Sequence, residues 1–277
     1  LAYAGLAEGY RSLGLAGELT PKEVFPQAKA AARRAIELDE SLAEAHAVLG
    51  YIIFWYDWDW KAAENEIKRA VELNPDSADA HHSYATLLSN TGRHTEALAE
   101  SRRARELDPL DLRISALGGQ FLTHAGQADE ALAILQKVIE LDSNHWLAHS
   151  FAASAYIEKG MFDHAIAEAR KAKELPGRST APVGFLGFAL ARSGKQAEAR
   201  AVLQELLKSS KEQYISAYTI AMVYNGLDER DQAIAWLEKA YQNREPRITF
   251  LNADPKWNSL RDDPRFQDLV RRVGFPA

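Results

Sequence analysis

The chain has 277 residues, of which 47% are hydrophobic and 26% are charged, and its formal net charge is −6. This composition is typical of a folded chain with enough apolar residues for a substantial core. The negative charge and the lack of a lysine- and arginine-rich block argue against binding to a nucleic-acid backbone. There is no cysteine, which excludes disulfides, thiolate metal sites and cysteine nucleophiles.

The sequence also lacks the usual signals for membranes and secretion. No apolar run approaches the roughly 20 residues that a membrane-spanning helix needs. The first stretch, LAYAGLAEGYRSLG, lacks the basic-then-apolar order of a signal peptide. We therefore expect a cytoplasmic chain without membrane insertion. Because the stretch begins without an initiator methionine and reads as the interior of a helix, we also expect a fragment of a longer protein.

Residues 1–42 are predicted to form a first pair of helices. Small and apolar residues recur at helical spacing in the first half, at Tyr3, Leu6, Ala7, Tyr10 and Gly14. The segment LAGELTPKEVF at 15–25 then interrupts the pattern, and Ala28 and Ala35 continue it. We interpret 15–25 as an insertion between two packed helices.

A strict period follows along most of the chain. Glycines recur every 34 residues at Gly92, Gly126, Gly160 and Gly194. An alanine follows each of them at a constant distance, and one more keeps the same period, at Ala97, Ala131, Ala165, Ala199 and Ala233. A fixed period of this length indicates an array of repeats, each a supersecondary unit that cannot bury its apolar face alone.

The repeat resembles the tetratricopeptide repeat. In AHHSYATLLSNTGRHTEALAESRRARELDP the family's constrained slots hold Ala85, Leu88, Gly92, Ala97, Ala104 and Pro109. The resemblance implies an all-α, right-handed α-solenoid (superhelix) of about seven helix-turn-helix units. We assign the units to 1–42, 43–77, 78–111, 112–145, 146–179, 180–213 and 214–247.

Physical reasons support these slots. Small residues allow two helices to approach closely where they cross, and larger side chains there would cost about 1–3 kcal/mol each. Glycine ends the first helix of a unit because it adopts the left-handed conformation easily. In the last unit Asp228 stands in the place of this glycine.

The unit at 43–77 is one residue longer and contains the aromatic run FWYDWDW. We place Tyr51, Phe54 and Trp55 at the end of its first helix, facing the inner surface of the array. Trp58 takes the place of the turn glycine, and Trp60 is predicted to be core. We expect Asp57 or Asp59 to cap the second helix.

Residues 248–277 depart from the period and are predicted to be capping helices. Asp254-Pro255 and Asp263-Pro264 each combine an N-cap acid with proline at the first helical position. Phe266, Leu269, Val270 and Val273 then form an apolar stripe that would cover the last repeat.

Histidines offer the main possibility of chemistry. His145 and His149 stand four residues apart, a spacing that can bring two imidazoles to one helix face. However, His46, His81 and His149 all occupy a slot that packs between the two helices of a unit, and no third ligand lies nearby in sequence. With no catalytic motif either, we predict no metal, no cofactor and no enzymatic activity.

The resemblance implies that the inner surface of the array binds a ligand. Its positions in this chain that are candidates for the groove are Arg11, Tyr51, Phe54, Trp55, His82, Thr86, Asn90, Arg113, Gln120, His124, Ser150, Ser154, Phe188, Arg192, Tyr218 and Asn225. The lysine and asparagine of the chaperone-binding carboxylate clamp are missing from the matching positions. Capture of an Hsp70- or Hsp90-type C-terminus is therefore not expected.

The order of YAGLAEGYRSLG, TPKEVFPQAKAAARRAIELD, YDWDW and ADPKWNSLRDDPRFQDLVRRVG resembles the C-terminal arrays of bacterial signalling and transcriptional regulator proteins. The resemblance implies a scaffold or regulatory module that binds a peptide or protein. A small-molecule sensor that controls an N-terminal DNA-binding, kinase or cyclase domain is the alternative, and a homo-oligomer stays open.

Overall fold

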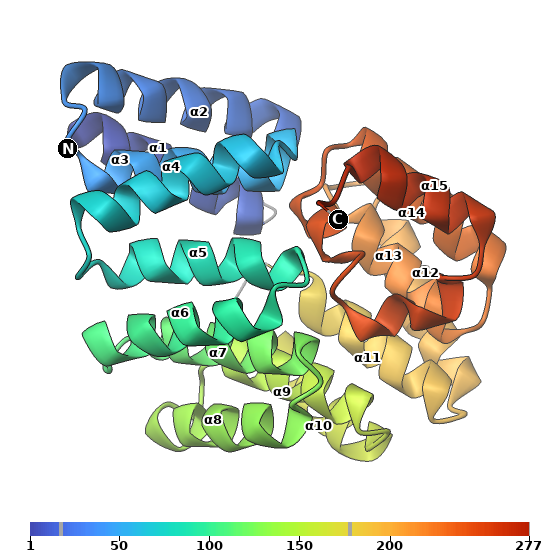
Figure 1. Cartoon of the computed structure of the whole chain (residues 1–277). Helices are drawn as coiled ribbons and strands as arrows, with labels where there is room; N and C mark the ends of the chain where they lie inside the picture. The colour runs from blue at the N-terminus through green and yellow to red at the C-terminus, as the bar shows by residue number, and fades with distance from the viewer. Residues whose placement is uncertain (17–18, 177–178, 277) are drawn as a thin grey trace. The chain divides into compact units, whose positions relative to one another are not determined.

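The computed structural model describes residues 1–16, 19–176 and 179–276, and in these ranges every regular element is helical (Figure 1). The all-α fold predicted from the repeat is thus confirmed, and the chain is an α-solenoid built from helix-turn-helix pairs. Gly17 and Glu18, in the predicted insertion, lie outside the described residues. None of the helices in the described ranges is both long and apolar enough to cross a membrane.

The chain divides into two compact units, which we describe separately. Unit 1 contains 1–111, 243–253 and 270–277, and unit 2 contains 112–242 and 254–269. The C-terminal residues are therefore shared between the units. The predicted boundary between array and cap at residue 247 stays a prediction.

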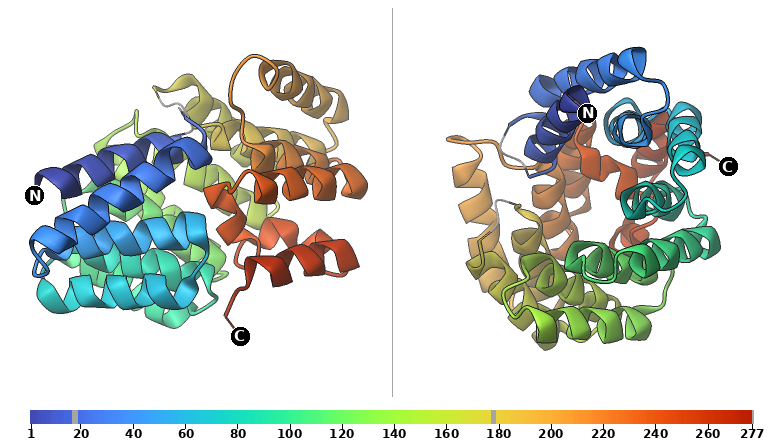
Figure 2. Two further views of the ribbon diagram at one scale, coloured as in Figure 1. Left: turned by 90° about the horizontal axis from the view of Figure 1, so that it is seen from above. Right: turned by 90° about the vertical axis from the view of Figure 1, so that its left-hand side faces the viewer.

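Unit 1 begins with three helical hairpins, each formed by two consecutive helices (Figures 1 and 2). Their bounds are α1 Ala2–Ala16 and α2 Pro21–Leu38; α3 Ala43–Ile52, extended by the π-helix η1 Ile53–Asp57, and α4 Trp60–Leu73; α5 Ala78–Asn90 and α6 His94–Leu107. The first helices of the hairpins also contact one another, since α3 packs against both α1 and α5.

Unit 2 continues the same pattern with four hairpins. Their bounds are α7 Leu112–His124 and α8 Ala128–Leu141; α9 Trp146–Glu158 and α10 Phe162–Glu174; α11 Ala181–Arg192 and α12 Gln196–Ser209; α13 Ala217–Gly226 and α14 Arg230–Gln242. Here too the first helices stack, α7 on α9, α9 on α11 and α11 on α13. Their stacked sides form one face in each unit.

Three short elements follow the last hairpin. They are the 3₁₀-helices η2 Pro246–Phe250 and η3 Pro255–Leu260, and the α-helix α15 Pro264–Val273. Asp254 caps η3 by accepting a hydrogen bond from the Lys256 backbone N–H at 3.0 Å. Asp263 likewise accepts one from the Arg265 N–H at 2.9 Å. The two predicted acid-proline starts are confirmed, although the first opens a 3₁₀-helix.

The repeated alanines lie where helices pack most closely. Ala97, Ala131, Ala165, Ala199 and Ala233 are all 1% exposed or less. A larger side chain at these positions would collide with the facing helix, which explains why the period is kept so strictly.

The turns between paired helices share one left-handed residue, which is glycine in four units and another residue in two. Gly92, Gly126, Gly160 and Gly194 adopt left-handed conformations with φ between 68° and 84°. Trp58 (φ 59°) and Asp228 (φ 60°) adopt the same region in their own units. Both therefore replace the turn glycine in conformation as well as in sequence, at a cost of about 1–2 kcal/mol each relative to glycine.

The extra residue of the unit at 43–77 is absorbed by the π-helix η1. A π-turn inserts one residue into a helix without breaking its hydrogen-bonded ladder. Trp58 closes it, with its N–H bonded to the Ile53 carbonyl at 2.9 Å. Of the two predicted caps, Asp59 holds the N-terminus of α4 by accepting from the Ala62 N–H, and Asp57 pairs with Lys29 instead.

Candidate functional site

The candidate site of each unit is its inner face, which we define as the predicted groove residues on the stacked first helices. In unit 1 these are Arg11, Tyr51, Phe54, Trp55, His82, Thr86 and Asn90. All except Arg11 are less than 9% exposed. The inner face of unit 1 is therefore a packed surface rather than an open polar one.

Tyr51 is the centre of this face. The Arg11 guanidinium lies 4.6 Å from the centre of its ring, and the His82 ring centre lies 6.4 Å away. Burial disfavours the charge of Arg11, yet hydrogen bonding to Glu8 and the attraction of Tyr51 raise the pKa of the guanidinium above its ordinary value. Thr86 donates its hydroxyl proton to the His82 carbonyl at 2.9 Å, so it is bonded within its own helix.

The other end of the same face is covered by η2. The Trp55 and Phe250 rings meet edge to face at 5.3 Å, and Asn90 Nδ2 donates to Thr249 Oγ1 at 3.3 Å. Phe54 is fully buried between Trp55 and Trp60. Within the described ranges, Nε1 of Trp55 and Oδ1 of Asn90 are buried with no hydrogen-bond partner. Aromatic packing and a hydrogen bond thus both connect the covering segment to this face.

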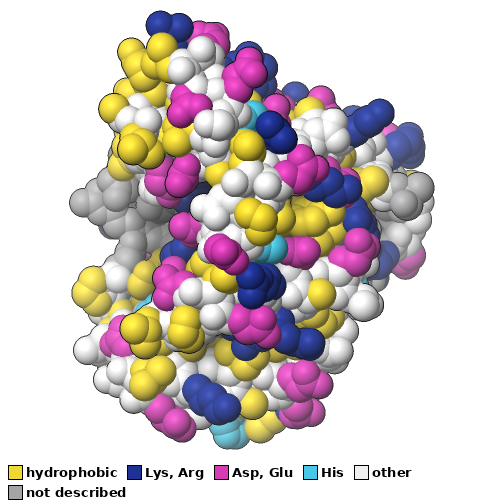
Figure 3. Space-filling view, turned by 60° about the vertical axis from the view of Figure 1, so that its left-hand side comes forward, with side chains coloured by type: hydrophobic (Ala, Val, Ile, Leu, Met, Phe, Trp, Pro, Cys, Tyr) yellow, Lys and Arg dark blue, Asp and Glu magenta, His cyan; other side chains and the backbone are white. Residues whose placement is uncertain are grey.

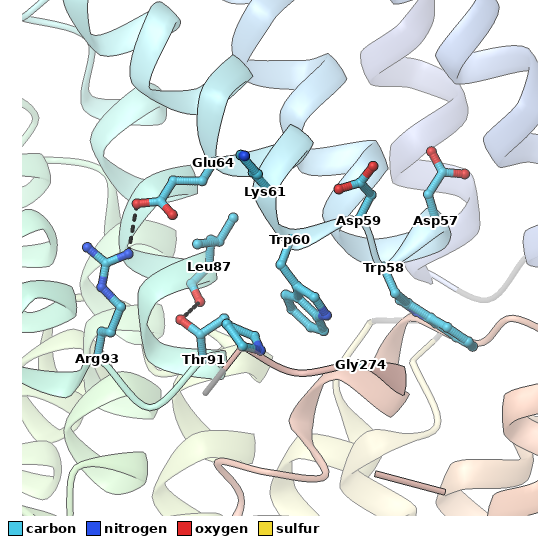
Figure 4. Close-up of a pocket in the computed structure, with 11 residues that line it drawn as sticks. Asp57, Trp58, Asp59, Trp60, Lys61, Glu64, Leu87, Thr91, Arg93 and Gly274 are labelled. Carbon is cyan, nitrogen blue, oxygen red and sulfur yellow. Dashed lines mark hydrogen bonds and ion pairs between the residues drawn. The ribbon is translucent and has the colours of Figure 1, made fainter. Parts of the chain in front are cut away.

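A cavity of about 730 Å³ opens beside the turn of the aromatic run (Figure 4). It is lined by Asp57, Trp58, Asp59, Trp60, Lys61, Glu64, Leu87, Thr91, Arg93, Gly274 and Pro276. Figure 4 shows Glu64 bonded to Arg93 at one side and the two tryptophans at the other. The Trp60 ring stacks on Phe275 at 4.9 Å and donates to the Val273 carbonyl at 3.2 Å, so it is buried as predicted.

The acid in this cavity is strongly ionised. Partial burial would by itself raise the pKa of Glu64, but hydrogen bonds from Arg93, Lys68 and Tyr84 lower it to about 2. The Arg93 side chain donates to Glu64 at 2.7 Å and to both carboxylate oxygens of Glu96. Two of the charges of the cavity wall, those of Glu64 and Arg93, are therefore paired with each other.

In unit 2 the predicted groove residues differ in how open they are. Arg113 and Gln120 on α7 are half-buried, and Arg192 on α11 is exposed and donates to Asp228 at 3.0 Å. The remaining residues are buried, namely His124, Ser150, Ser154, Phe188, Tyr218 and Asn225. Three of these buried residues, Ser154, Tyr218 and Asn225, contact η3.

Lys256 of η3 inserts its side chain into the inner face of unit 2, where 1% of that side chain is exposed. Its Nζ lies 2.8 Å from Ser154 Oγ, 2.8 Å from Asp254 Oδ1 and 3.8 Å from Glu158 Oε1. The ammonium also lies 5.1 Å from the centre of the Phe185 ring. Burial raises the pKa of Glu158, and the positive charge of Lys256 opposes that rise.

Trp257, Ser259 and the Lys256 carbonyl also form hydrogen bonds with the inner face of unit 2. Trp257 Nε1 donates to the Tyr218 hydroxyl at 2.7 Å, and the two rings meet at 5.1 Å. Asn225 Nδ2 donates to the Lys256 carbonyl at 2.7 Å, and Asn225 Oδ1 accepts from the Ser259 hydroxyl at 2.9 Å. Ser154, Tyr218 and Asn225, which lie on α9 and α13, thus all bond to the same short segment, η3.

The histidines have structural roles. Nδ1 of His46, His81 and His149 faces a glutamate of the second helix, at 2.6, 2.5 and 2.6 Å, and Nε2 faces a backbone carbonyl at 2.9–3.1 Å. His145 caps α9 by accepting from the Ala148 N–H at 3.3 Å. The described residues contain no group of three His, Asp or Glu side chains arranged to hold a metal ion.

Sequence reasoning missed Lys256 and its neighbours. Asp254-Pro255 marks a helix start, so the sequence predicts only a capping helix for this segment. A 3₁₀-helix this short has no apolar period, so no pattern distinguishes a buried lysine from an exposed one. The cavity was missed for a related reason, since its C-terminal wall comes from residues far away in sequence.

Comparison with protein families identifies the repeats. Models described as tetratricopeptide repeat match 66–99, 122–175 and 215–245. The chain therefore carries a tetratricopeptide repeat domain, a class of module that generally mediates protein–protein interactions and for which no catalytic family is indicated here. Among curated proteins none matches the chain.

Solved structures show the same fold at low identity. A tetratricopeptide repeat protein from Parabacteroides merdae covers 98% of this chain and is covered to 98%, with a TM-score of 0.61 and 14% identity. PilF of Pseudomonas aeruginosa covers 75% of this chain and is itself covered to 90%, with a TM-score of 0.55 and 22% identity. The structure of the human IFIT1 dimer with m7Gppp-AAAA covers 90% of this chain, and 63% of the IFIT1 chain is covered, with a TM-score of 0.63 and 18% identity. These similarities support the solenoid fold alone.

Proposed function

We propose that the chain is a non-enzymatic regulatory or scaffold module that binds a peptide or protein segment on its inner faces. The order of its motifs, which resembles arrays of bacterial signalling proteins, suggests that it serves a larger protein of that kind. Mixed charges on its surface, as on the face drawn in Figure 3, favour recognition by hydrogen bonds over long-range attraction.

One observation carries this proposal. The inner face of unit 2 already holds a peptide segment through side-chain and backbone contacts, with Asn225 bonded to a main-chain carbonyl and Tyr218 to an indole N–H. Main-chain bonds give affinity to any extended or turned segment, while pockets for side chains give selectivity. A surface that makes both kinds of contact is suited to bind a segment of another protein.

The test is a capture experiment on an extract of the source organism. The immobilised chain should recover a defined partner, and inner-face variants His82→Ala and Arg113→Ala should reduce recovery several-fold. Arg170→Ala, on the second helix of its hairpin, α10, is the matched control because Arg170 is exposed and pairs with the exposed Glu198. Recovery that none of the inner-face variants changes would refute the proposal.

The cavity of unit 1 favours a second candidate function, small-molecule sensing that controls an N-terminal effector. Its volume of about 730 Å³ falls within the range of ligand pockets, and it offers two tryptophans with polar groups around them. A metabolite that binds there should raise the melting temperature of the wild-type chain, and Trp58→Ala should remove that rise. A broad thermal-shift screen without any stabilising compound would argue against it.

A further inference from the structure

The strongest unexplained feature of the molecule is the buried ammonium of Lys256. Taking a charge out of water is costly, and apolar residues of similar size often replace buried ion pairs without loss of stability. Here the ammonium contacts a hydroxyl, a carboxylate and an aromatic face, so its charge is fully met. This point of the inner face is therefore suited to hold a cation.

The partners of Lys256 come from the repeats as well as from its own segment. Ser154 and Glu158 lie on α9, and Phe185 lies on α11. Ser154 and Glu158 stand at two of the positions through which tetratricopeptide helices face their groove. Ser154, Glu158 and Phe185 therefore form the part of the ammonium subsite that belongs to the inner face, whereas Asp254 leaves together with the segment.

A second subsite accepts the next residue. Tyr218 meets the indole of Trp257 by its hydroxyl and its ring edge, and Asn225 fixes the carbonyl between the two side chains. The spacing of the two subsites thus matches two consecutive residues, a lysine followed by a tryptophan, in a 3₁₀ turn. An aromatic donor and a cation side by side are unusual enough to be selective.

We propose that the inner face of unit 2 is a receptor for a short lysine–tryptophan turn in a partner protein, and that the chain's own segment 254–260 is its resident occupant. The inference rests on the proposed function and names the chemistry of the ligand. A tethered occupant acts at an effective concentration of about millimolar, so a partner must compete with it. The apparent affinity of the wild-type face is reduced by the fraction of molecules in which the face is free.

The experiment measures binding of a synthetic peptide to the full chain. The probe is fluorescein-labelled NADPKWNSLRD, the sequence of residues 252–262, followed by fluorescence anisotropy. Lys256→Glu places a carboxylate against Asp254 and Glu158 and should expel the resident segment by repulsion. This variant should bind the peptide at least about tenfold more tightly than the wild type does. Replacement of the peptide's lysine by norleucine should abolish that gain.

Asn258→Glu is the control, because Asn258 is exposed in the same 3₁₀-helix and the substitution also introduces a carboxylate there. It should bind the peptide as the wild type does. A folded Lys256→Glu chain that does not bind the peptide would overturn the inference. So would equal binding of the norleucine peptide.

A second measurement decides the matter if Lys256→Glu does not fold. In the wild type, acetylation of the Lys256 amine followed by mass spectrometry should be slow, and a saturating amount of N-acetylated peptide should accelerate it at least about fivefold, since displacement exposes the amine. Unchanged labelling would overturn the inference. If the peptide fails while His82→Ala still reduces partner capture, the proposed function stands without this ligand; loss of both refutes both.

Discussion

The two units hold their shares of the C-terminal residues by different physical means. In unit 1 two aromatic contacts, Phe250 against Trp55 and Phe275 on Trp60, accompany the hydrogen bonds of Asn90 and Trp60. In unit 2 a buried charge, the ammonium of Lys256, lies beside the ring contact of Trp257 with Tyr218. Aromatic contacts tolerate small shifts, whereas buried ionic contacts lose much of their value when one partner moves. A buried charge with specific partners therefore distinguishes the C-terminal contacts of unit 2 from those of unit 1.

The largest effect is expected from the aromatic contacts. Trp60→Ala should lower the free energy of unfolding by about 4 kcal/mol, because it removes a buried ring that stacks on Phe275 and leaves a cavity. Trp60→Phe keeps the ring packing but loses the hydrogen bond to the Val273 carbonyl, and it should lower the free energy of unfolding by about 1–2 kcal/mol. Urea denaturation measures both. Equal losses for the two variants would show that the hydrogen bond, rather than the stack, holds the segment.

The ionic contact of unit 2 comes next. Lys256→Ala should cost about 3 kcal/mol, because Asp254 and Glu158 then lose their common partner in a buried site. Glu158→Gln in the same chain should restore part of the loss, since it removes one uncompensated carboxylate. Lys208→Ala, at an exposed position of α12, should change stability by less than about 0.5 kcal/mol. A loss as small as this control would contradict the comparison.

A feature common to both units sharpens the contrast. His81→Ala in unit 1 and His149→Ala in unit 2 each remove an imidazole that is bonded to a glutamate and a carbonyl. We expect losses of about 2 kcal/mol in both cases, because the histidines bond to the same kinds of partner in both units. A difference of more than about 1 kcal/mol between the two, measured in urea, would mean that the units differ in their repeats as well.

The smallest effect at neutral pH is expected at Glu64. Its pKa in the folded chain, about 2, lies below the ordinary 4.5. The stability it contributes is therefore complete well above pH 4.5 and lost as pH falls toward 2. Glu64→Gln should cost about 1 kcal/mol at pH 7 and give a shallower decline between those pH values. The exposed control Glu72→Gln should show the same dependence of stability on pH as the wild type. If Glu64→Gln also showed the wild-type dependence, the lowered pKa of Glu64 would be contradicted.

The sequence predicts the repeat hairpins well because close packing and turn conformation restrict residue type. Ala97 and its periodic equivalents have no room for larger side chains. Gly92 and its equivalents occupy a region of φ that other residues adopt at a cost, and Trp58 could be placed in the same slot because the period continues around it. Local constraints of this kind can be read from one chain.

The sites were harder to predict because they depend on contacts between residues far apart in sequence. Asn90 meets Thr249, and Ser154 meets Lys256, across more than 100 residues. No period links such pairs, so the sequence indicates an inner-face position without telling what covers it. The groove residues thus stay predictions for ligand binding, while the contacts of Trp55 and Asn90 with η2 and of Ser154, Tyr218 and Asn225 with η3 are findings that only the structure provides.

The most direct test of the account is hydrogen exchange of the wild-type chain in low concentrations of denaturant. If 254–260 is a displaceable occupant, the amide of Trp257 should exchange through a local opening that costs less than the opening of α9 and depends little on denaturant. If the segment is a permanent part of the core, this amide will exchange with the same free energy and the same denaturant dependence as the amides of α9. That result would contradict the account.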